Sequence, residues 1–345
     1  MNRPNNNEIG MEVRVEIRPA GVEEDSRLAH HVTSIHSAPF PLSSPRFPLV
    51  RVTTDGAHAG TTHPAGPAQP ISVRRDIWGI GDSLGERDWA ILRSVSEHRF
   101  LTVSQIHTLH FGELTPVSGL RIAQRVLVRL RNLRLLGTLE RQVGGVRAGS
   151  SGLVHFLDAN GERLLRAESG QRMRRHMTDP SETFLKHTLA VSSASVALVT
   201  AHRAGKLELL TSQVEPAAWR RYVGIGGARL TLKPDLYADT AESSNSDYLD
   251  SWFIEIDLGT ESIPRLIKKC RDYEAYRRSG IEQDKNEGTF PRIVWSMTAK
   301  DPAKAERRRV ALREAIDRDR NLPSELFFVI TPDELIGLMQ EAGNL

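Results

Sequence analysis

The sequence predicts a chain of mixed class, α/β and α+β, with two folded modules behind an N-terminal tail. Two observations predict this organisation. Between residues 84 and 168, three segments of helical periodicity are followed by two short β-like runs. Between residues 178 and 335, the pattern reads helix, strand, strand, strand, helix, strand (α-β-β-β-α-β). A chain of 345 residues is long enough for two domains of ordinary size.

Residues 1–80 are predicted to be a disordered tail. Nine of the eighteen prolines fall in this segment, among Ser, Thr, His and Gly. Apolar and charged residues alternate over 11–18, so one short strand stays open there. The histidines of the tail have no regular spacing, and we therefore expect no metal site from them.

Three helices are predicted next. Apolar residues recur at helical spacing over 86–98. Thr102 is a suitable N-cap for a second helix, 103–110. Ser118 is the predicted cap of a third and longer helix, which ends near Leu136 where a glycine follows.

Two β-like runs, 138–143 and 153–158, follow the third helix and flank a glycine-rich segment, 144–152. Three helices and then a β-hairpin is the order of elements in a winged helix-turn-helix. We therefore expect a winged-helix domain over 84–168, closed by a short helix at 160–167.

The second module, 178–335, alternates helical and extended segments. Its predicted helices are 181–203, 263–278 and 303–318, and its predicted strands are 207–213, 229–239, 252–258, 292–297 and 325–330. The glycine run Gly224 to Gly227 lacks the strand-to-helix context of a phosphate-binding loop, and we expect a hairpin turn there.

Composition limits the classes of protein. The single cysteine, Cys270, excludes an internal disulfide framework and any cysteine-based zinc site. No run of about 18 apolar residues is present, so we expect no membrane partner. The N-terminus lacks an apolar signal region, and the expected compartment is the cytoplasm. The net charge of +3 and the pI of about 9.1 fit a nucleic-acid partner without demanding one.

The third predicted helix is strongly basic and contains no acidic residue. A stripe of arginines opposite an apolar stripe suits a helix that lies in the major groove, where arginine binds phosphates or guanine edges. We therefore expect double-stranded DNA as the partner. The residues predicted to bind it are Arg121, Arg125, Arg129, Arg131 and Arg134 on the helix, and Arg141 and Arg147 on the wing.

Two other interpretations of the basic helix stay open. It can be a solvated surface that happens to use arginine, although such surfaces usually mix acids with bases. A winged helix can also bind proteins, and a protein-binding adaptor would have no salt-sensitive affinity for DNA. Winged-helix proteins often dimerise, so a homodimer is a further open option.

Three acids mark the second module. Asp235 follows Pro234 within a predicted strand, and Glu255 and Asp257 alternate along a strongly apolar strand. The period of two puts Glu255 and Asp257 on one face together with Phe253. Buried carboxylates need compensation, which a divalent cation or an ion pair could supply.

This pattern resembles the PD-(D/E)xK superfamily, the fold of restriction endonucleases. The resemblance implies that Asp235 and Glu255 bind Mg²⁺ or Mn²⁺ and that a lysine orients the attacking water. The position expected to hold that lysine is Asp257, so the lysine must come from the next helix, as Lys268 or Lys269. Asp257 would then be a third metal ligand or the partner of the catalytic Lys269.

Residues 85–300 as a whole resemble the replication-relaxation family, which is similar to mobilisation relaxases. The matching features are the arginine-rich helix, His187, Pro234 with Asp235, the block Glu255 to Glu261, and Lys269 with Tyr273. The resemblance implies a protein of plasmid or integrative-element replication or transfer, with the activity of a Mg²⁺-dependent nickase or relaxase-like nuclease. The alternative is a non-catalytic DNA-binding accessory factor or regulator on a degenerate nuclease fold.

Three further residues of the second module have alternative interpretations. His187 lies in an apolar helix, where a core histidine is commoner than a catalytic one. Tyr273 and Tyr276 follow Lys269 on one helix. No adjacent base can be named for either tyrosine, so we expect them to pack and not to act as nucleophiles.

Overall fold

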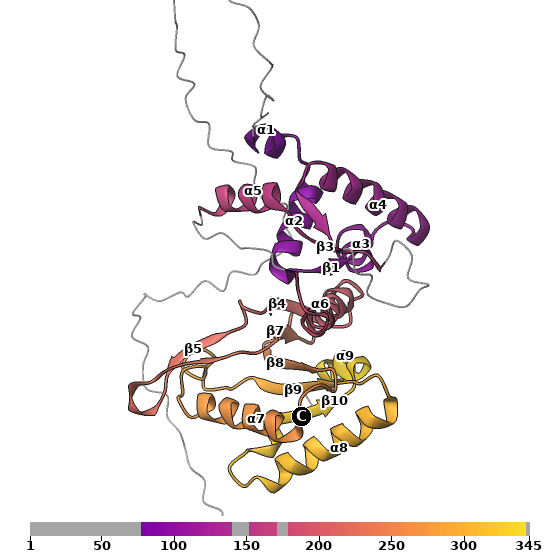
Figure 1. The fold of residues 1–345 in the computed structure, drawn as a ribbon. Coiled ribbons are helices and arrows are strands. Elements are labelled where there is room, and N and C mark those ends of the chain that lie inside the picture. Colours follow the sequence, from indigo (N-terminus) through magenta and orange to yellow (C-terminus); the bar gives the residue numbers. More distant parts are fainter. Residues whose placement is uncertain (1–76, 140–151, 171–178, 343–345) are drawn as a thin grey trace, which may run out of the picture. The chain divides into compact units, whose positions relative to one another are not determined.

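The computed structural model describes residues 77–139, 152–170 and 179–342, which belong to one compact unit, Ile71–Leu345 (Figure 1). The predicted tail up to residue 76, the segment 140–151 with Arg141 and Arg147, and the connector 171–178 lie outside the described residues. The helices are α1 (Ile77–Asp82), α2 (Glu86–His98), α3 (Val103–Phe111), α4 (Pro116–Asn132), α5 (Ala159–Ser169), α6 (Glu182–Arg203), α7 (Ile263–Arg277), α8 (Pro302–Arg318) and α9 (Leu335–Gln340). The strands are β1 (Leu101–Thr102), β2 (Leu136–Thr138), β3 (Val154–Leu157), β4 (Glu208–Val214), β5 (Arg220–Val223), β6 (Arg229–Leu232), β7 (Leu236–Ala241), β8 (Asp250–Asp257), β9 (Arg292–Met297) and β10 (Phe327–Ile330).

Helices α2, α3 and α4 pack around one apolar cluster, in which Leu92, Ile106 and Leu127 are buried. The predicted N-cap is present, because Thr102 Oγ1 accepts a hydrogen bond from the Gln105 amide at 3.2 Å. A small antiparallel sheet, in the order β1-β3-β2, packs against these helices and adds Leu101 and Leu136 to the same cluster. Its outer strands, β1 and β2, both pair with β3, so the described part of the predicted hairpin region is extended as expected.

Helix α4 is shorter at its C-terminus than the predicted third helix. It begins at Pro116, two residues before the predicted cap Ser118, with proline in the first turn where its missing N–H costs nothing. It ends at Asn132, not near Leu136, because Arg134 adopts a left-handed conformation with φ of 55°. The Leu135 amide then bonds to the Leu130 carbonyl at 3.0 Å, which is the closing bond of a Schellman motif.

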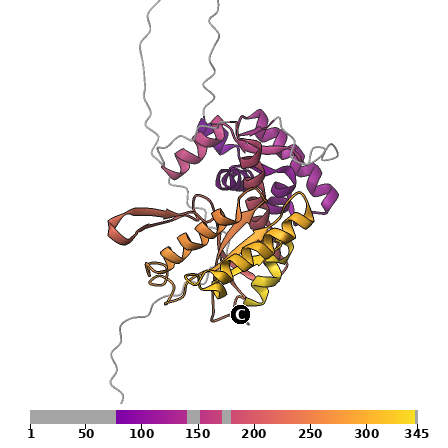
Figure 2. The ribbon, with the colours of Figure 1, turned by 60° about the horizontal axis from the view of Figure 1, so that its bottom comes forward.

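A five-stranded sheet in the order β10-β9-β8-β7-β4 forms the second half. Strand β7 is antiparallel to both β4 and β8, whereas β8, β9 and β10 are parallel because α7 and α8 connect them as crossovers. Helices α7 and α8 cover the face that carries Phe253 and Trp295. Helices α6 and α9 cover the opposite face, which carries Trp252 and Ile254 (Figures 1 and 2).

The strand predicted over 229–239 is two strands. Pro234 lies at the break, where it cannot donate to a sheet ladder. Before the break, β6 pairs only with β5 in a two-stranded hairpin, with the glycine run as its turn. After the break, β7 enters the five-stranded sheet. Asp235 therefore stands at the start of β7 and not within a continuous strand.

Helix α6 joins the two halves. Gln105 Nε2 on α3 donates to the Leu189 carbonyl at 3.1 Å, and Arg203 at the end of α6 donates to the Thr108 and Leu109 carbonyls. Among the described helices, α6 alone has the length and apolar character that could span a membrane. Half of its most apolar window is buried inside the fold, and core helices of soluble proteins have the same character, so the length is weak evidence for a membrane span.

Candidate active site

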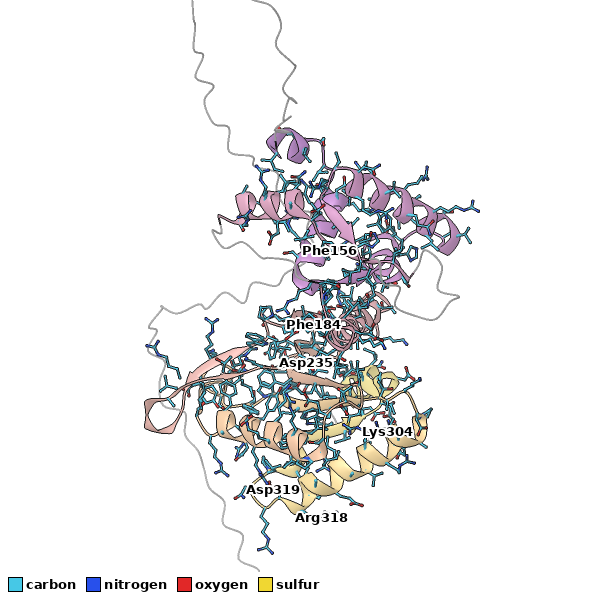
Figure 3. All side chains as sticks on the ribbon, viewed as in Figure 1. Phe156, Phe184, Asp235, Lys304, Arg318 and Asp319 are labelled. Atoms are coloured by element: carbon cyan, nitrogen blue, oxygen red, sulfur yellow. The ribbon has the colours of Figure 1, made fainter. Side chains whose placement is uncertain are left out.

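Adjacent strands bring the first two predicted acids together. Leu236 pairs with Ile254, and this antiparallel register sets Asp235 beside Glu255. The Ile256 amide donates to Asp235 Oδ2 at 2.8 Å and fixes that carboxylate at the end of the sheet (Figure 3). Both acids are buried, with 8% of Asp235 and 1% of Glu255 exposed. The domain thus holds two adjacent carboxyl groups away from water.

Helix α7 supplies the compensating cation. Lys269 Nζ donates to Glu255 Oε2 and lies 4.0 Å from Asp235 Oδ1. One helical turn later, the Tyr273 hydroxyl donates to Glu255 Oε1. Of the two lysines that the sequence offered, Lys268 is solvent-exposed and pairs with Asp272 at 2.9 Å. Lys269 is therefore the lysine that reaches the predicted acids.

His187 on α6 completes the cluster. Its Nε2 atom lies 3.3 Å from Asp235 Oδ1, and its side chain is 30% exposed. The hydrogen bond to Asp235 raises the pKa of His187, against the burial that lowers it. The sequence alone favoured a core histidine at this position. The structure instead puts it in contact with a predicted site residue, at the open side of the cluster.

The charges of the cluster depend on one another. Burial raises the pKa of Glu255 to about 8, an effect that Lys269 opposes and Asp235 reinforces. Burial also acts to raise the pKa of Asp235, but Lys269 and His187 outweigh it and hold that pKa below its usual value. Burial acts to lower the pKa of Lys269, but Glu255 and Asp235 outweigh it and raise it. At neutral pH the lysine is therefore charged and Asp235 is ionised, while burial shifts the pKa of Glu255 upwards against the two donors, Lys269 and Tyr273, that hold its carboxyl oxygens.

Asp257 does not join this cluster. Its Oδ2 atom accepts two hydrogen bonds from Arg308 on α8, at 2.6 Å from Nη2 and 3.1 Å from Nε, and its Oδ1 accepts the Gly259 amide at 3.1 Å. Throughout the described ranges, no group of three or more His, Cys, Asp or Glu side chains is arranged to hold a metal ion. Asp257 shares the sheet face of Glu255, as predicted, yet its partner is a guanidinium.

The two tyrosines after Lys269 have different partners. Tyr273 is buried against Phe253 and donates to Glu255, a contact that its spacing of four residues from Lys269 could have indicated. Tyr276 donates to Glu282 and packs against Tyr222. Tyr273 thus belongs to the cluster as the residue that orients Glu255.

The five predicted DNA-binding arginines on and just after α4 have three kinds of environment. Arg121 and Arg125 are exposed, and neither has a hydrogen bond or ion pair to another described residue. Arg129 binds Asp88 at 2.5 Å, and Arg134 lies 3.3 Å from Asp158. Arg131 is half-buried, and its Nε has no hydrogen-bond partner among the described atoms. Among the exposed arginines of α4, Arg121 and Arg125 are therefore the two without an acidic partner among the described residues.

A family comparison covers both of these regions. The replication-relaxation family matches residues 92–293, more than half of the chain. The chain belongs to the replication-relaxation family. The match runs from α2 to the start of β9, so it includes the arginines of α4 as well as Asp235, Glu255 and Lys269. Membership of this family suggests a role in plasmid replication or transfer. No curated protein and no solved structure matches the chain significantly.

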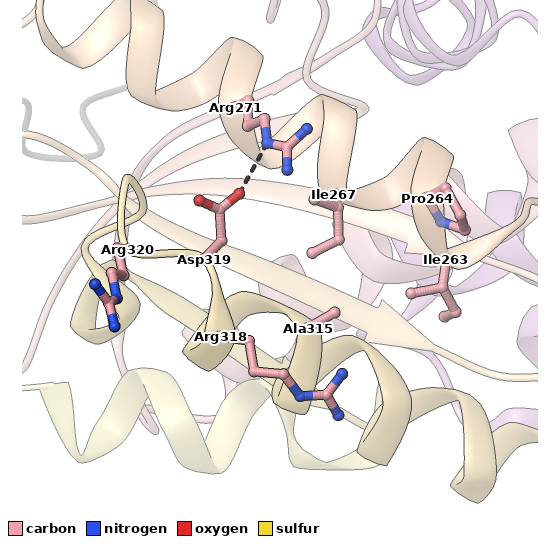
Figure 4. Close-up of a pocket in the computed structure, with 8 residues that line it drawn as sticks. All are labelled: Ile263, Pro264, Ile267, Arg271, Ala315, Arg318, Asp319 and Arg320. Atoms are coloured by element: carbon pink, nitrogen blue, oxygen red, sulfur yellow. Dashed lines mark hydrogen bonds and ion pairs between the residues drawn. The ribbon is translucent and has the colours of Figure 1, made fainter.

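A separate pocket lies partly beyond the family match, between α7 and the end of α8 (Figure 4). It has a volume of about 460 Å³, and Arg271, Arg318 and Arg320 contribute to its lining. Arg271 donates to Asp319 at 2.8 Å, which compensates part of this positive charge. None of the predicted site residues lines the pocket, so its chemistry is distinct from that of the carboxylate cluster.

Proposed function

We propose that this member of the replication-relaxation family binds double-stranded plasmid or mobile-element DNA and nicks it as a Mg²⁺-dependent endonuclease. The observation that carries the proposal is the meeting of Lys269 with Asp235 and Glu255. These side chains come from a helix and two strands, and they are brought together inside a largely apolar domain. Clusters of buried ionisable groups with perturbed pKa values are frequent at catalytic sites.

The order of elements supports the same interpretation. Helices α2, α3 and α4 precede β2 and β3, in the order of a winged helix. In the second half, the order α6, β4, β7, β8, α7, β9 agrees with the restriction-endonuclease-like core that the sequence predicts, with the β5–β6 hairpin as an insertion. In such a fold the acids of the middle strands and a lysine form the site, and Asp235, Glu255 and Lys269 would take these roles.

The donor set is chemically suited to Mg²⁺ or Mn²⁺. Magnesium is commonly bound through one or two carboxylates and completes its shell with water and substrate phosphate oxygens, so Asp235 and Glu255 suffice. A carboxyl group binds a metal ion only when it is ionised, and burial raises the pKa of Glu255, so the metal affinity of the site should increase with pH. When bound, the ion would supply a more acidic water and would stabilise negative charge on the phosphate.

The surrounding side chains have definable roles in this proposal. Tyr273 and the Ile256 amide fix the orientations of Glu255 and Asp235. Lys269 is charged and partly exposed, so it is positioned to orient a water molecule or to contact a phosphate oxygen. His187 contacts Asp235 through the Oδ1 atom, and we assign His187 a positioning role. Asp257, bound by Arg308, is assigned to structure and not to the metal.

DNA contact is assigned to α4. Arg121 and Arg125 are four residues apart, so they project from one side of the helix. Both are exposed, and no described acid compensates them. A helix with this charge pattern is suited to phosphate contacts and to guanine edges in the major groove.

A second candidate function is a non-catalytic DNA-binding accessory factor. One observation favours it, because each carboxylate oxygen of Asp235 and Glu255 already has a protein partner. Those partners are His187, the Ile256 amide, Tyr273 and Lys269. A cluster satisfied in this way could stabilise the fold without holding a metal.

A combined assay separates the two functions. Supercoiled plasmid that carries the cognate origin is incubated with the wild-type protein, Glu255→Ala or Lys269→Ala, in Mg²⁺ or Mn²⁺. Nicking by the wild type alone, with unchanged DNA affinity of both variants, supports the endonuclease. Calorimetric titration with Mn²⁺ should show binding that Asp235→Ala abolishes. Salt-sensitive DNA binding without nicking or Mn²⁺ binding would instead favour the accessory factor.

A further inference from the structure

The β5–β6 hairpin is the one two-stranded sheet in the described part of the chain. It extends as a ribbon away from the five-stranded sheet and its helices in both views (Figures 1 and 2). It is inserted between β4 and β7, and its second strand leads through Lys233 and Pro234 directly to Asp235. The ribbon therefore ends three residues before Asp235 in the sequence, next to the proposed catalytic site.

The two faces of this ribbon differ in character. Directly paired residues share a face, and successive residues alternate between faces. One face carries Tyr222 and Leu232, which are buried against α7 and the sheet. Arg220 belongs to this inner face, where it pairs with Glu282 at 3.2 Å and lies 4.3 Å from the ring centroid of Tyr237. The inner face accounts for the attachment of the ribbon to the domain.

The outer face is basic and exposed. Arg221 and Arg229 lie on it and are exposed, and neither forms a hydrogen bond or ion pair with any residue that the structure describes. Lys233 continues the same face with its ammonium 4.8 Å from the ring centroid of Trp219. No Asp or Glu occurs anywhere from residue 216 to residue 234. Val223, also on this face, is 60% exposed.

We propose that the outer face of the β5–β6 ribbon is a second DNA-contacting surface, which binds duplex DNA beside the catalytic cluster. This inference rests on the proposed DNA-binding function and adds a contact that α4 does not provide. A two-stranded ribbon fits the major groove of B-form DNA. Arg221, Arg229 and Lys233 would bind phosphates along that groove, and Val223 would contact a thymine methyl group.

The chemistry favours DNA over duplex RNA. The major groove of A-form RNA is deep and too narrow for a ribbon or its side chains to read. A protein partner is the other class of occupant, and an exposed apolar residue such as Val223 could serve it. Three cations without any acid, however, favour a polyanion with regularly spaced charges.

The test is the salt dependence of binding by the full-length protein to a short fluorescent DNA duplex. Affinity is measured between about 50 and about 200 mM salt. The double variant Arg221→Ala/Arg229→Ala should bind more weakly than wild type. The slope of log affinity against log salt should fall by about 2, because each lost phosphate contact removes about 0.9. The variant Arg221→Lys/Arg229→Lys should keep the wild-type slope, since charge and not packing carries the contact.

Two further variants make the outcome decisive. Arg307→Ala/Arg318→Ala removes the same charge from exposed positions of α8, 71% and 74% exposed, and should leave the slope unchanged. Arg121→Ala/Arg125→Ala tests α4 independently. If the α4 variant weakens binding while the ribbon variant behaves like the α8 control, the ribbon inference alone is overturned. If the wild type itself has no salt-sensitive affinity, the proposed DNA-binding function fails together with it.

Discussion

The pairing of Asp257 with Arg308 leads to a prediction about stability. Asp257 is 3% exposed. Among the described residues its one charged partner is Arg308, which binds it through two nitrogens, Nε and Nη2. Arg308→Ala leaves a buried carboxylate without its cation. Breaking a buried ion pair by removing one partner costs about 3–5 kcal/mol. We therefore expect Arg308→Ala to lower the free energy of unfolding by about 4 kcal/mol.

Urea denaturation followed by circular dichroism measures this change. With a slope of about 3 kcal/mol per molar urea, the midpoint should fall by more than about 1 M. The neighbouring Arg307 offers a matched control, because its side chain is 71% exposed and its ion pair with Asp301 is long, at 3.8 Å. Arg307→Ala should cost less than about 1 kcal/mol. The double variant Arg308→Ala/Asp257→Asn should recover part of the loss. Equal midpoints for Arg308→Ala and Arg307→Ala would refute the structural role of the pair.

Three other predictions concern buried contacts. Burial lowers the pKa of His155 to about 4, so its stabilising contribution is complete above pH 6.5 and declines as the pH falls towards 4. Going from pH 7 to pH 5, wild type should lose about 2 kcal/mol more unfolding free energy than His155→Gln, and equal losses in chemical denaturation would contradict this. Gly259 has φ of +76°, and an added Cβ would meet the Ala299 Cβ at 2.8 Å. Gly259→Ala should therefore lower the melting temperature, and an unchanged melting temperature would exclude strain at this position. Gln105→Ala removes the donor to the Leu189 carbonyl and should increase amide exchange in α3 and α6, while leaving exchange in α7 unchanged.

Local patterns in the sequence predicted most of the elements, and the differences have local causes. Helical periodicity correctly predicted α3 and α6, and Thr102 is the N-cap of α3 as predicted, whereas Ser181, predicted as the first residue of the helix, is the N-cap of α6. The end of α4 was missed because a left-handed arginine, Arg134, occupies a position that glycine usually marks. The proline at 234 was visible, but its division of one strand into a hairpin strand and a sheet strand depends on pairing with β5.

In the candidate site, too, local sequence patterns predict the face on which a residue lies but not its partner. A period of two predicted that Glu255 and Asp257 share a face, and that prediction is confirmed. Their different partners depend on α7 and α8, and Arg308 lies about fifty residues beyond Asp257. Likewise Arg129 was assigned to DNA from its spacing, although it binds Asp88 on α2. Spacing along one element predicts a shared face, whereas the partner across that face is set by tertiary packing.

Nicking of supercoiled cognate plasmid by a pair of isosteric variants tests the central proposal most directly. Glu255→Gln removes a charge from the cluster with Lys269, whereas Asp257→Asn removes one from the pair with Arg308. DNA affinity and circular dichroism verify that each variant is folded. The proposal predicts that, in Mg²⁺ or Mn²⁺, Glu255→Gln abolishes the conversion to open circle while Asp257→Asn retains it. Nicking that persists in Glu255→Gln, or that no wild-type preparation can perform, would contradict the assignment of the catalytic site.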